Sequence, residues 1–145
     1  MNDINNTYID FSSPEMDWTN AREPQHYENN SEQALEIYSA EFYDSQAGNR
    51  MLKVKFKSAN DPAGFVIITD FLSMPTVDDD DEKREKKLLG LKRFHDALNM
   101  RPQAVNLVDP LNNVYTGKQL RALITLEDNE QYGLQNRIRR YLKSA

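Results

Sequence analysis

Cysteine is absent from this 145-residue sequence, and histidine occurs only at positions 26 and 95. The lack of cysteine excludes disulfide bonds and thiolate metal sites, and it is consistent with a cytoplasmic protein. His26 and His95 do not have the H-x-x-x-H or facial-triad spacing of metal-binding histidines. We therefore predict no metal site built on these residue types.

Long apolar runs are also missing, so we expect no membrane-spanning helix and no membrane partner. The first residues, MNDINNTYIDF, lack the basic and apolar regions of a secretory signal peptide. Together with the lack of cysteine, these features predict a cytoplasmic location.

Several common enzyme motifs are missing as well. The chain contains no G-x-S-x-G, G-x-x-x-x-G-K-[ST] or G-x-G-x-x-G motif. The run of four aspartates at 78–81 could suggest a magnesium site, but consecutive carboxylates point in different directions. The start of a helix is the favoured interpretation of this run. We predict a protein that is not an enzyme and that needs no cofactor or metal.

Acidic residues are concentrated in the first part of the sequence. Residues 1–33 contain seven acidic residues and one basic residue, whereas the whole chain has a net charge of −5. Residues 34–145 therefore have a net charge of about +1. We predict an acidic, Asn-rich N-terminal arm over 1–33, with Phe11, Met16 and Trp18 as docking points, and one domain over 34–145. The alternative for 1–33 is a strap packed on the domain.

The apolar pattern of the domain predicts five strands and one helix. The strands are expected at 34–43, 51–57, 65–72, 118–128 and 132–142, and the helix at about 80–99. Apolar residues alternate with lysines in the second strand, and a phase shift after Ile37 predicts a β-bulge in the first. The third strand is more continuously apolar, so we expect partial burial of both its faces. In the helix, the predicted inward positions are Leu88, Leu91, Phe94 or His95, and Leu98.

This order of elements predicts the fold. Three strands, a helix and two strands are the order of the OB-fold, a five-stranded Greek-key barrel that binds oligonucleotides or oligosaccharides. We predict a mainly β protein with this barrel and its one helix between strands 3 and 4. A β-α-β sheet is the alternative, but three consecutive strands of antiparallel type before the only helix argue against it.

Three segments resemble a known family. GNRMLKVKF at 48–56, LLGLKRFHDALNM at 88–100 and TGKQLRALITLEDNEQYGLQNRIRRYL at 116–142 are similar to conserved blocks of a phage-encoded family that was long catalogued as a domain of unknown function. The resemblance implies an OB-fold protein that binds single-stranded DNA in phage replication or recombination, in the host cytoplasm. Asn99 and Met100 replace the glycine that usually follows the helix, and no pattern of the family covers the arm.

The candidate DNA-binding residues are cations and tyrosines on the predicted strands. They are Lys53, Lys55, Lys57, Arg121, Arg137, Arg139, Tyr38, Tyr43, Tyr132 and Tyr141. Proteins that bind single strands combine cations that follow the phosphates with aromatic rings on which bases stack. Strand alternation predicts that Arg137 and Arg139 share a face and that Arg140 lies on the other. The alternative is that the lysines form a solvated face and the tyrosines seal the ends of the barrel.

Partners follow from the same features. We predict that single-stranded DNA is bound with little sequence preference, and that the acidic arm competes for the basic groove or recruits replication or recombination proteins. The alternative function is a protein–protein adaptor with the OB-fold that holds such an enzyme and has little DNA affinity of its own. The sequence leaves open whether the chain forms a homodimer.

Overall fold

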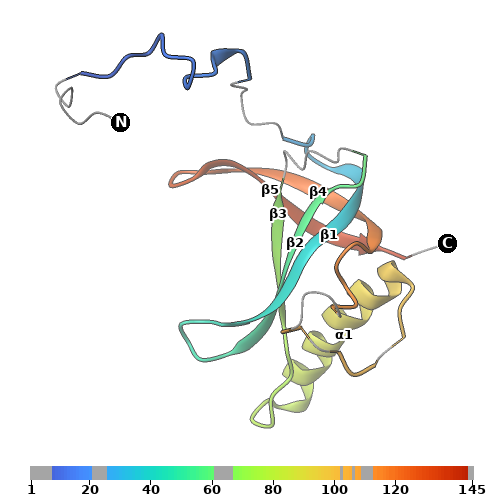
Figure 1. The fold of residues 1–145 in the computed structure, drawn as a ribbon. Helices are drawn as coiled ribbons and strands as arrows, with labels where there is room; N and C mark the ends of the chain where they lie inside the picture. The colour runs from blue at the N-terminus through green and yellow to red at the C-terminus, as the bar shows by residue number, and fades with distance from the viewer. Residues whose placement is uncertain are drawn as a thin grey trace.

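The computed structural model describes residues 8–20, 26–60, 67–101, 103–105, 107–108 and 113–143. These residues form a mainly β structure with five strands and one α-helix (Figure 1). The elements are β1 Ser31–Asp44, β2 Arg50–Ser58, β3 Ile68–Ser73, α1 Asp81–Leu98, β4 Gln119–Asn129 and β5 Gly133–Leu142. A 3-10 helix, η2, covers Trp18–Asn20. The predicted order of strands and helix is confirmed.

The strands form one antiparallel sheet in the order β3-β2-β1-β4-β5. The sheet coils until its edge strands approach each other, and the Tyr141 hydroxyl of β5 donates a hydrogen bond to the Asp70 carboxylate of β3. Within the described ranges, no backbone ladder joins β3 to β5, so the sheet is not closed. The predicted antiparallel β structure with one helix is confirmed, whereas the predicted closure into a barrel is not seen.

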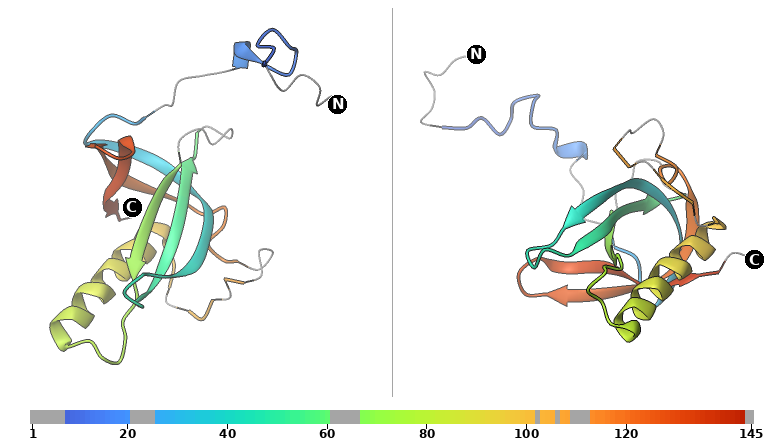
Figure 2. Two further views of the ribbon diagram at one scale, coloured as in Figure 1. Left: turned by 90° about the vertical axis from the view of Figure 1, so that its left-hand side faces the viewer. Right: turned by 90° about the horizontal axis from the view of Figure 1, so that it is seen from below.

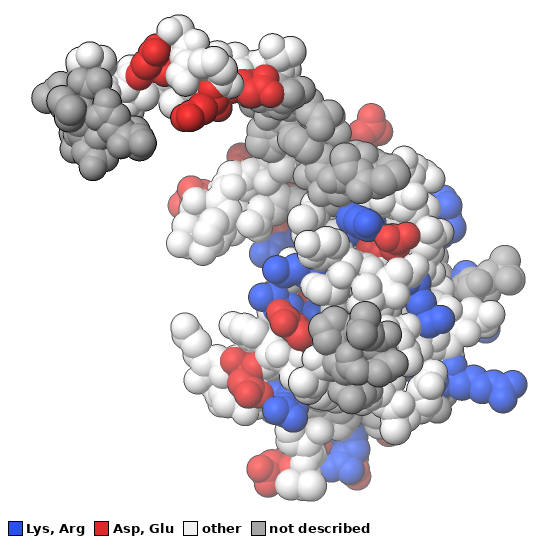
Figure 3. Space-filling model, in the orientation of Figure 1, with Lys and Arg blue, Asp and Glu red and all other residues white. Residues whose placement is uncertain are grey.

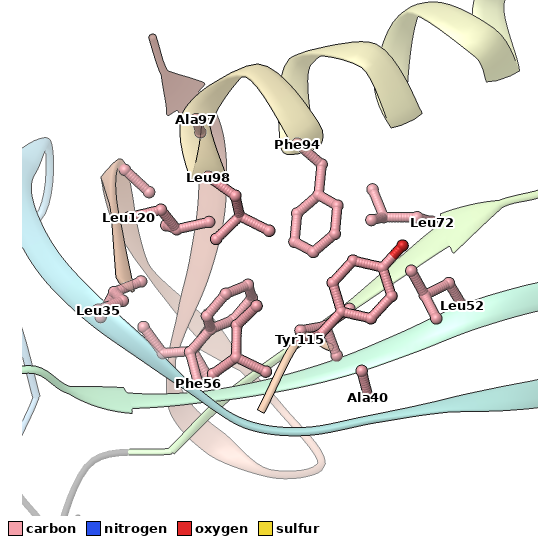
Figure 4. Packing of buried hydrophobic residues seen from close by; sticks show 14 of the residues in the cluster. Leu35, Ala40, Leu52, Phe56, Leu72, Phe94, Ala97, Leu98, Tyr115 and Leu120 are labelled. Carbon is pink, nitrogen blue, oxygen red and sulfur yellow. The ribbon is translucent and has the colours of Figure 1, made fainter. Parts of the chain in front are cut away.

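The core lies between the inner face of the coiled sheet and α1. Figure 4 shows Phe94 pointing from the helix into this space, where it is fully buried. On β2, the predicted inward residues Leu52, Val54 and Phe56 are at most 4% exposed. The register between β1 and β2 shifts between Ile37 and Ser39, which confirms the predicted bulge.

Both ends of α1 are fixed by local hydrogen bonds. Asp80 is the N-cap, and its carboxylate accepts a hydrogen bond of 2.7 Å from the backbone N–H of Lys83. At the other end, Asn99 takes the left-handed conformation with φ 56°, a position at which asparagine replaces the commoner glycine. The backbone N–H of Met100 then donates to the His95 carbonyl at 2.9 Å. The predicted bounds of the helix are confirmed.

The first half of α1 packs less than its sequence suggests. Leu88, which we predicted to point inward, is 49% exposed, because the first turns of the helix extend past the sheet (Figure 1). Asp79 precedes the helix and accepts hydrogen bonds from the Thr76 backbone N–H at 2.8 Å and the Lys87 ammonium at 3.0 Å. Asp79 and Asp80 of the aspartate run thus have structural partners.

The N-terminal segment joins the sheet earlier than the predicted domain boundary. β1 begins at Ser31, which lies opposite Ile124 of β4. Residues 8–20 contact one another, with the rings of Phe11 and Trp18 6.2 Å apart, and Figure 2 shows this segment away from the sheet. In the described part of the chain, no helix is long and apolar enough to cross a membrane.

Candidate nucleic-acid interface

The outer face of β2 carries the predicted row of lysines. Because the apolar side chains of this strand enter the core, the alternating Lys53, Lys55 and Lys57 point to the other face of the sheet. Figure 3 shows a hollow between the β1–β2 hairpin and the β4–β5 hairpin, with Lys and Arg side chains gathered in it. The sheet thus brings cations to a concave part of the surface.

Two aromatic rings lie beside this row. Tyr43 at the end of β1 and Phe71 on β3 are 39% and 42% exposed, and their ring centroids are 5.1 Å apart. The Lys53 ammonium lies 5.6 Å from the centroid of Tyr43 and 6.0 Å from that of Phe71. Three strands therefore contribute to one cluster of two exposed rings and a cation.

Phe71 was missed in the sequence analysis. The two faces of β3 differ more than its apolar sequence suggests, because Ile68 and Leu72 are buried while Phe71 lies on the opposite face. The signal was present in the alternation of Thr69, Phe71 and Ser73, which share the outer face in register with β2.

Glutamates pair with two of the three lysines. The ammonium of Lys57 is 3.3 Å from the Glu36 carboxylate, and that of Lys53 is 3.9 Å from the Glu41 carboxylate. A hydrogen bond from the Gln119 side chain, followed by one from Lys57, lowers the pKa of Glu36. Among the described residues, Lys55 has no ion-pair or hydrogen-bond partner for its ammonium group.

The predicted arginines form a second group on β4 and β5. Arg121 pairs with Glu32 at 2.7 Å, and Arg137 pairs with Glu127 at 3.0 Å. The Arg139 guanidinium donates a hydrogen bond of 3.0 Å to the Asn30 side chain. Tyr132, in the turn between β4 and β5, is 65% exposed. By register, Arg121 and Arg137 lie on the outer face of the sheet, as the lysine row does, because Leu120, Ala122 and Ile124 of β4 point into the core.

A second bulge changes which arginines share a face. Arg140 lies opposite Leu123 and Arg137 lies opposite Thr125, with a register shift between them that leaves Arg139 as the extra residue. The prediction that Arg140 lies on the other face is therefore wrong, because Arg140 aligns with Arg137. The spacing of two inward residues, Ile138 and Tyr141, by three positions was the signal for this bulge.

The two remaining tyrosines differ in exposure. Tyr38, in the bulge of β1, is 56% exposed. Tyr141 packs inside, with its ring centroid 6.2 Å from Phe56 and 5.4 Å from Phe94. This position removes Tyr141 from the candidate interface and gives it a structural role.

The arrangement of rings and cations is suited to a flexible polyanion. The ring pair Tyr43–Phe71 presents surface for stacking, and Lys55, which has no charged partner within the described ranges, lies opposite Thr69 on the same face. A scan against protein-family models gave no match, and a search of curated proteins gave none. The resemblance to the phage family stays a prediction.

Proposed function

We propose that this protein binds single-stranded DNA, with little sequence preference, on the outer face of β2 and β3. The observation that carries the proposal is the lysine row of β2 beside the exposed Tyr43–Phe71 pair. Figure 3 shows Lys and Arg side chains in the hollow between the two hairpins. The resemblance to the phage family supports a role in DNA replication or recombination.

The topology favours the OB-fold. The sheet order, the helix between β3 and β4, and the approach of β3 to β5 match a five-stranded Greek-key barrel that is partly open. In that fold, oligonucleotides bind over strands 2 and 3 and the loops that join strands 1–2 and 4–5. The lysine row and Phe71 occupy the corresponding strands.

Base stacking and phosphate contacts both contribute to the binding free energy in this mechanism. A base stacked on an aromatic ring contributes about 1–3 kcal/mol, and every base offers a ring face. Ion pairs at the surface contribute only about 0–1 kcal/mol, so a phosphate can replace Glu41, whose side chain is 58% exposed, more readily than the half-buried Glu36 as the partner of its lysine. The displaced glutamates remain near the phosphates and repel them, which makes us expect modest affinity with a strong dependence on salt.

The pairing of lysines with glutamates favours a second candidate. A face on which positive and negative charges alternate is suited to a protein surface with the complementary pattern. The second proposal is therefore an adaptor that holds a replication or recombination enzyme and has little DNA affinity of its own.

A titration with fluorescent oligo-dT separates the two candidates. We expect binding that weakens steeply between about 50 and about 200 mM salt, and much weaker binding of double-stranded DNA. Phe71→Ala should weaken binding by about 5- to 150-fold, the equivalent of one lost stacking contact. Lys55→Ala should reduce the salt slope by about 0.7.

Phe42→Ala is the matched control for Phe71→Ala. Phe42 is 40% exposed, close to the 42% of Phe71, but it points to the other face of the sheet, opposite Leu52. Equal losses of affinity in the two variants would contradict stacking on Phe71. If the folded wild type shows no measurable binding of oligo-dT at low salt, the adaptor becomes the better-supported function.

A further inference from the structure

An apolar groove lies on the other side of the β1–β2 hairpin from the lysine row. It has a volume of ≈ 780 Å³ and runs between α1, β1, β2 and the segment that follows the helix. Its walls are mostly apolar and include Phe42, Leu52, Leu88, Leu89, Met100 and Tyr115. Leu88 and Leu89 are 49% and 44% exposed, so the groove presents apolar surface that the described residues leave uncovered.

The arm contains an apolar segment of complementary character. Between Tyr8 and Trp18, five large apolar side chains are 38–68% exposed: Tyr8, Ile9, Phe11, Met16 and Trp18. The Trp18 indole N–H donates a hydrogen bond of 2.8 Å to the Phe11 carbonyl, which draws these two residues together. The segment therefore carries apolar groups that its own contacts do not bury.

Charge has little part in this contact. The charged residues of α1 that line the groove are Glu85, Lys92 and Asp96, and the Lys92 ammonium lies 2.7 Å from the Asp96 carboxylate. We therefore expect burial of apolar surface to drive docking of the segment.

Geometry favours the arm of a second molecule over the chain's own arm. Tyr27 is anchored to β5, where its backbone N–H and carbonyl bond the Asn136 side chain at 2.9 and 3.0 Å. Nine residues from Tyr27 to Trp18 span at most about 32 Å. Phe42, at the groove, lies eleven residues along β1 from Ser31, or about 36 Å of strand. Figure 1 shows the chain entering the sheet at the end away from α1.

We propose that the groove binds the Tyr8–Trp18 segment of a second copy of this chain. Two copies that exchange arms in this way bury apolar surface on both molecules and form a closed dimer. This inference is independent of DNA binding, since the groove and the lysine row lie on opposite faces of the hairpin.

Trp18 is the only tryptophan, so its fluorescence reports directly on the arm. We expect its emission to shift to shorter wavelength as protein concentration rises, in parallel with an increase in mass measured by sedimentation equilibrium. Leu89→Glu should abolish the shift and weaken self-association by at least about tenfold. Leu134→Glu is the matched control, because Leu134 is 49% exposed and lies on β5, outside the groove.

A mixing experiment distinguishes exchange between molecules from docking within one molecule. Leu89→Glu has a damaged groove and an intact arm, whereas Phe11→Ala with Trp18→Ala has a damaged arm and an intact groove. Each variant should sediment as a monomer, and an equimolar mixture should recover association, because one intact arm can meet one intact groove.

Three outcomes would overturn the proposal. The first is a monomeric wild type at all concentrations tested, and the second is a Trp18 emission that is shifted but independent of concentration, which indicates docking on the chain's own groove. The third is an equal effect of Leu89→Glu and Leu134→Glu on association. Urea unfolding of each variant verifies that both leucine substitutions, which lie at exposed positions, leave the fold intact.

Discussion

The contact between Tyr141 and Asp70 is a side-chain hydrogen bond that links the two edge strands, and its removal tests how the coiled sheet is stabilised. Tyr141→Phe keeps the ring that packs against Phe56 and Phe94, and it removes only the hydroxyl that donates to the Asp70 carboxylate. The loss of stability in this variant therefore measures the free energy of the hydrogen bond together with the cost of leaving the Asp70 carboxylate without this donor.

The expected loss follows from the charge on the acceptor. Hydrogen bonds to charged groups contribute roughly 1.5–3 kcal/mol to stability, about twice the value for neutral pairs. For a domain of this size, each kcal/mol corresponds to about 4 °C in Tm, so Tyr141→Phe should lower Tm by about 6–12 °C. Urea unfolding at neutral pH gives the free energy of unfolding independently.

The pH dependence supplies a second readout. Burial, followed by the charge of Asp70 and its hydrogen bond, raises the pKa of Tyr141 well above its ordinary value of 10.0. Because the folded state holds this proton more tightly than the unfolded state, the proton contributes to the stability of the fold. This contribution is fully present below the unfolded pKa, and it is lost as pH rises through the folded pKa. The wild type should therefore lose stability above about pH 10, and Tyr141→Phe should lack this part of the loss.

Tyr27→Phe is the matched control. Tyr27 also packs against the core, but its buried hydroxyl has no hydrogen-bond partner among the described residues. Removal of an unpaired buried hydroxyl should leave stability unchanged or raise it slightly. If Tyr141→Phe costs less than about 0.5 kcal/mol, or no more than Tyr27→Phe, then the link between the edge strands does not stabilise the fold as reasoned.

Two further predictions concern the start of α1. Asp80→Ala should lower the free energy of unfolding by about 1 kcal/mol, measured by urea titration, because the Lys83 N–H loses its cap, and no loss would contradict the capping role. The bond from the Thr76 N–H, then that from Lys87, lowers the pKa of Asp79. The stability that the ionised Asp79 contributes is therefore present above the ordinary carboxyl pKa. It is lost as pH falls through the lowered pKa of Asp79 in the folded state. Asp79→Asn should lower Tm at neutral pH more than at about pH 3, and an equal loss at both would refute this account.

The sequence by itself determined the elements and most of the core. Alternation placed Leu52, Val54 and Phe56 inside, because a strand has a period of two and one face of β2 is apolar. The bounds of α1 could be predicted from the sequence because helix capping depends on neighbouring residues. Asp80 caps the start of the helix and Asn99 caps its end. The bulge after Ile37 could be predicted for the same reason, because it interrupts the alternation of apolar residues along β1.

Tertiary structure alone decided how the candidate interface is assembled. Cross-strand register sets which glutamate meets Lys53 or Lys57, and residues that pair across strands are distant in the sequence. The bulge at Arg139 reversed the face of every side chain beyond it, because one extra residue shifts a period of two by half. Coiling of the sheet brought Tyr141 to Asp70 from the opposite edge. A local pattern contains no information on such long-range contacts, so the sequence indicated candidate binding residues, while the fold determined which of them lie close together.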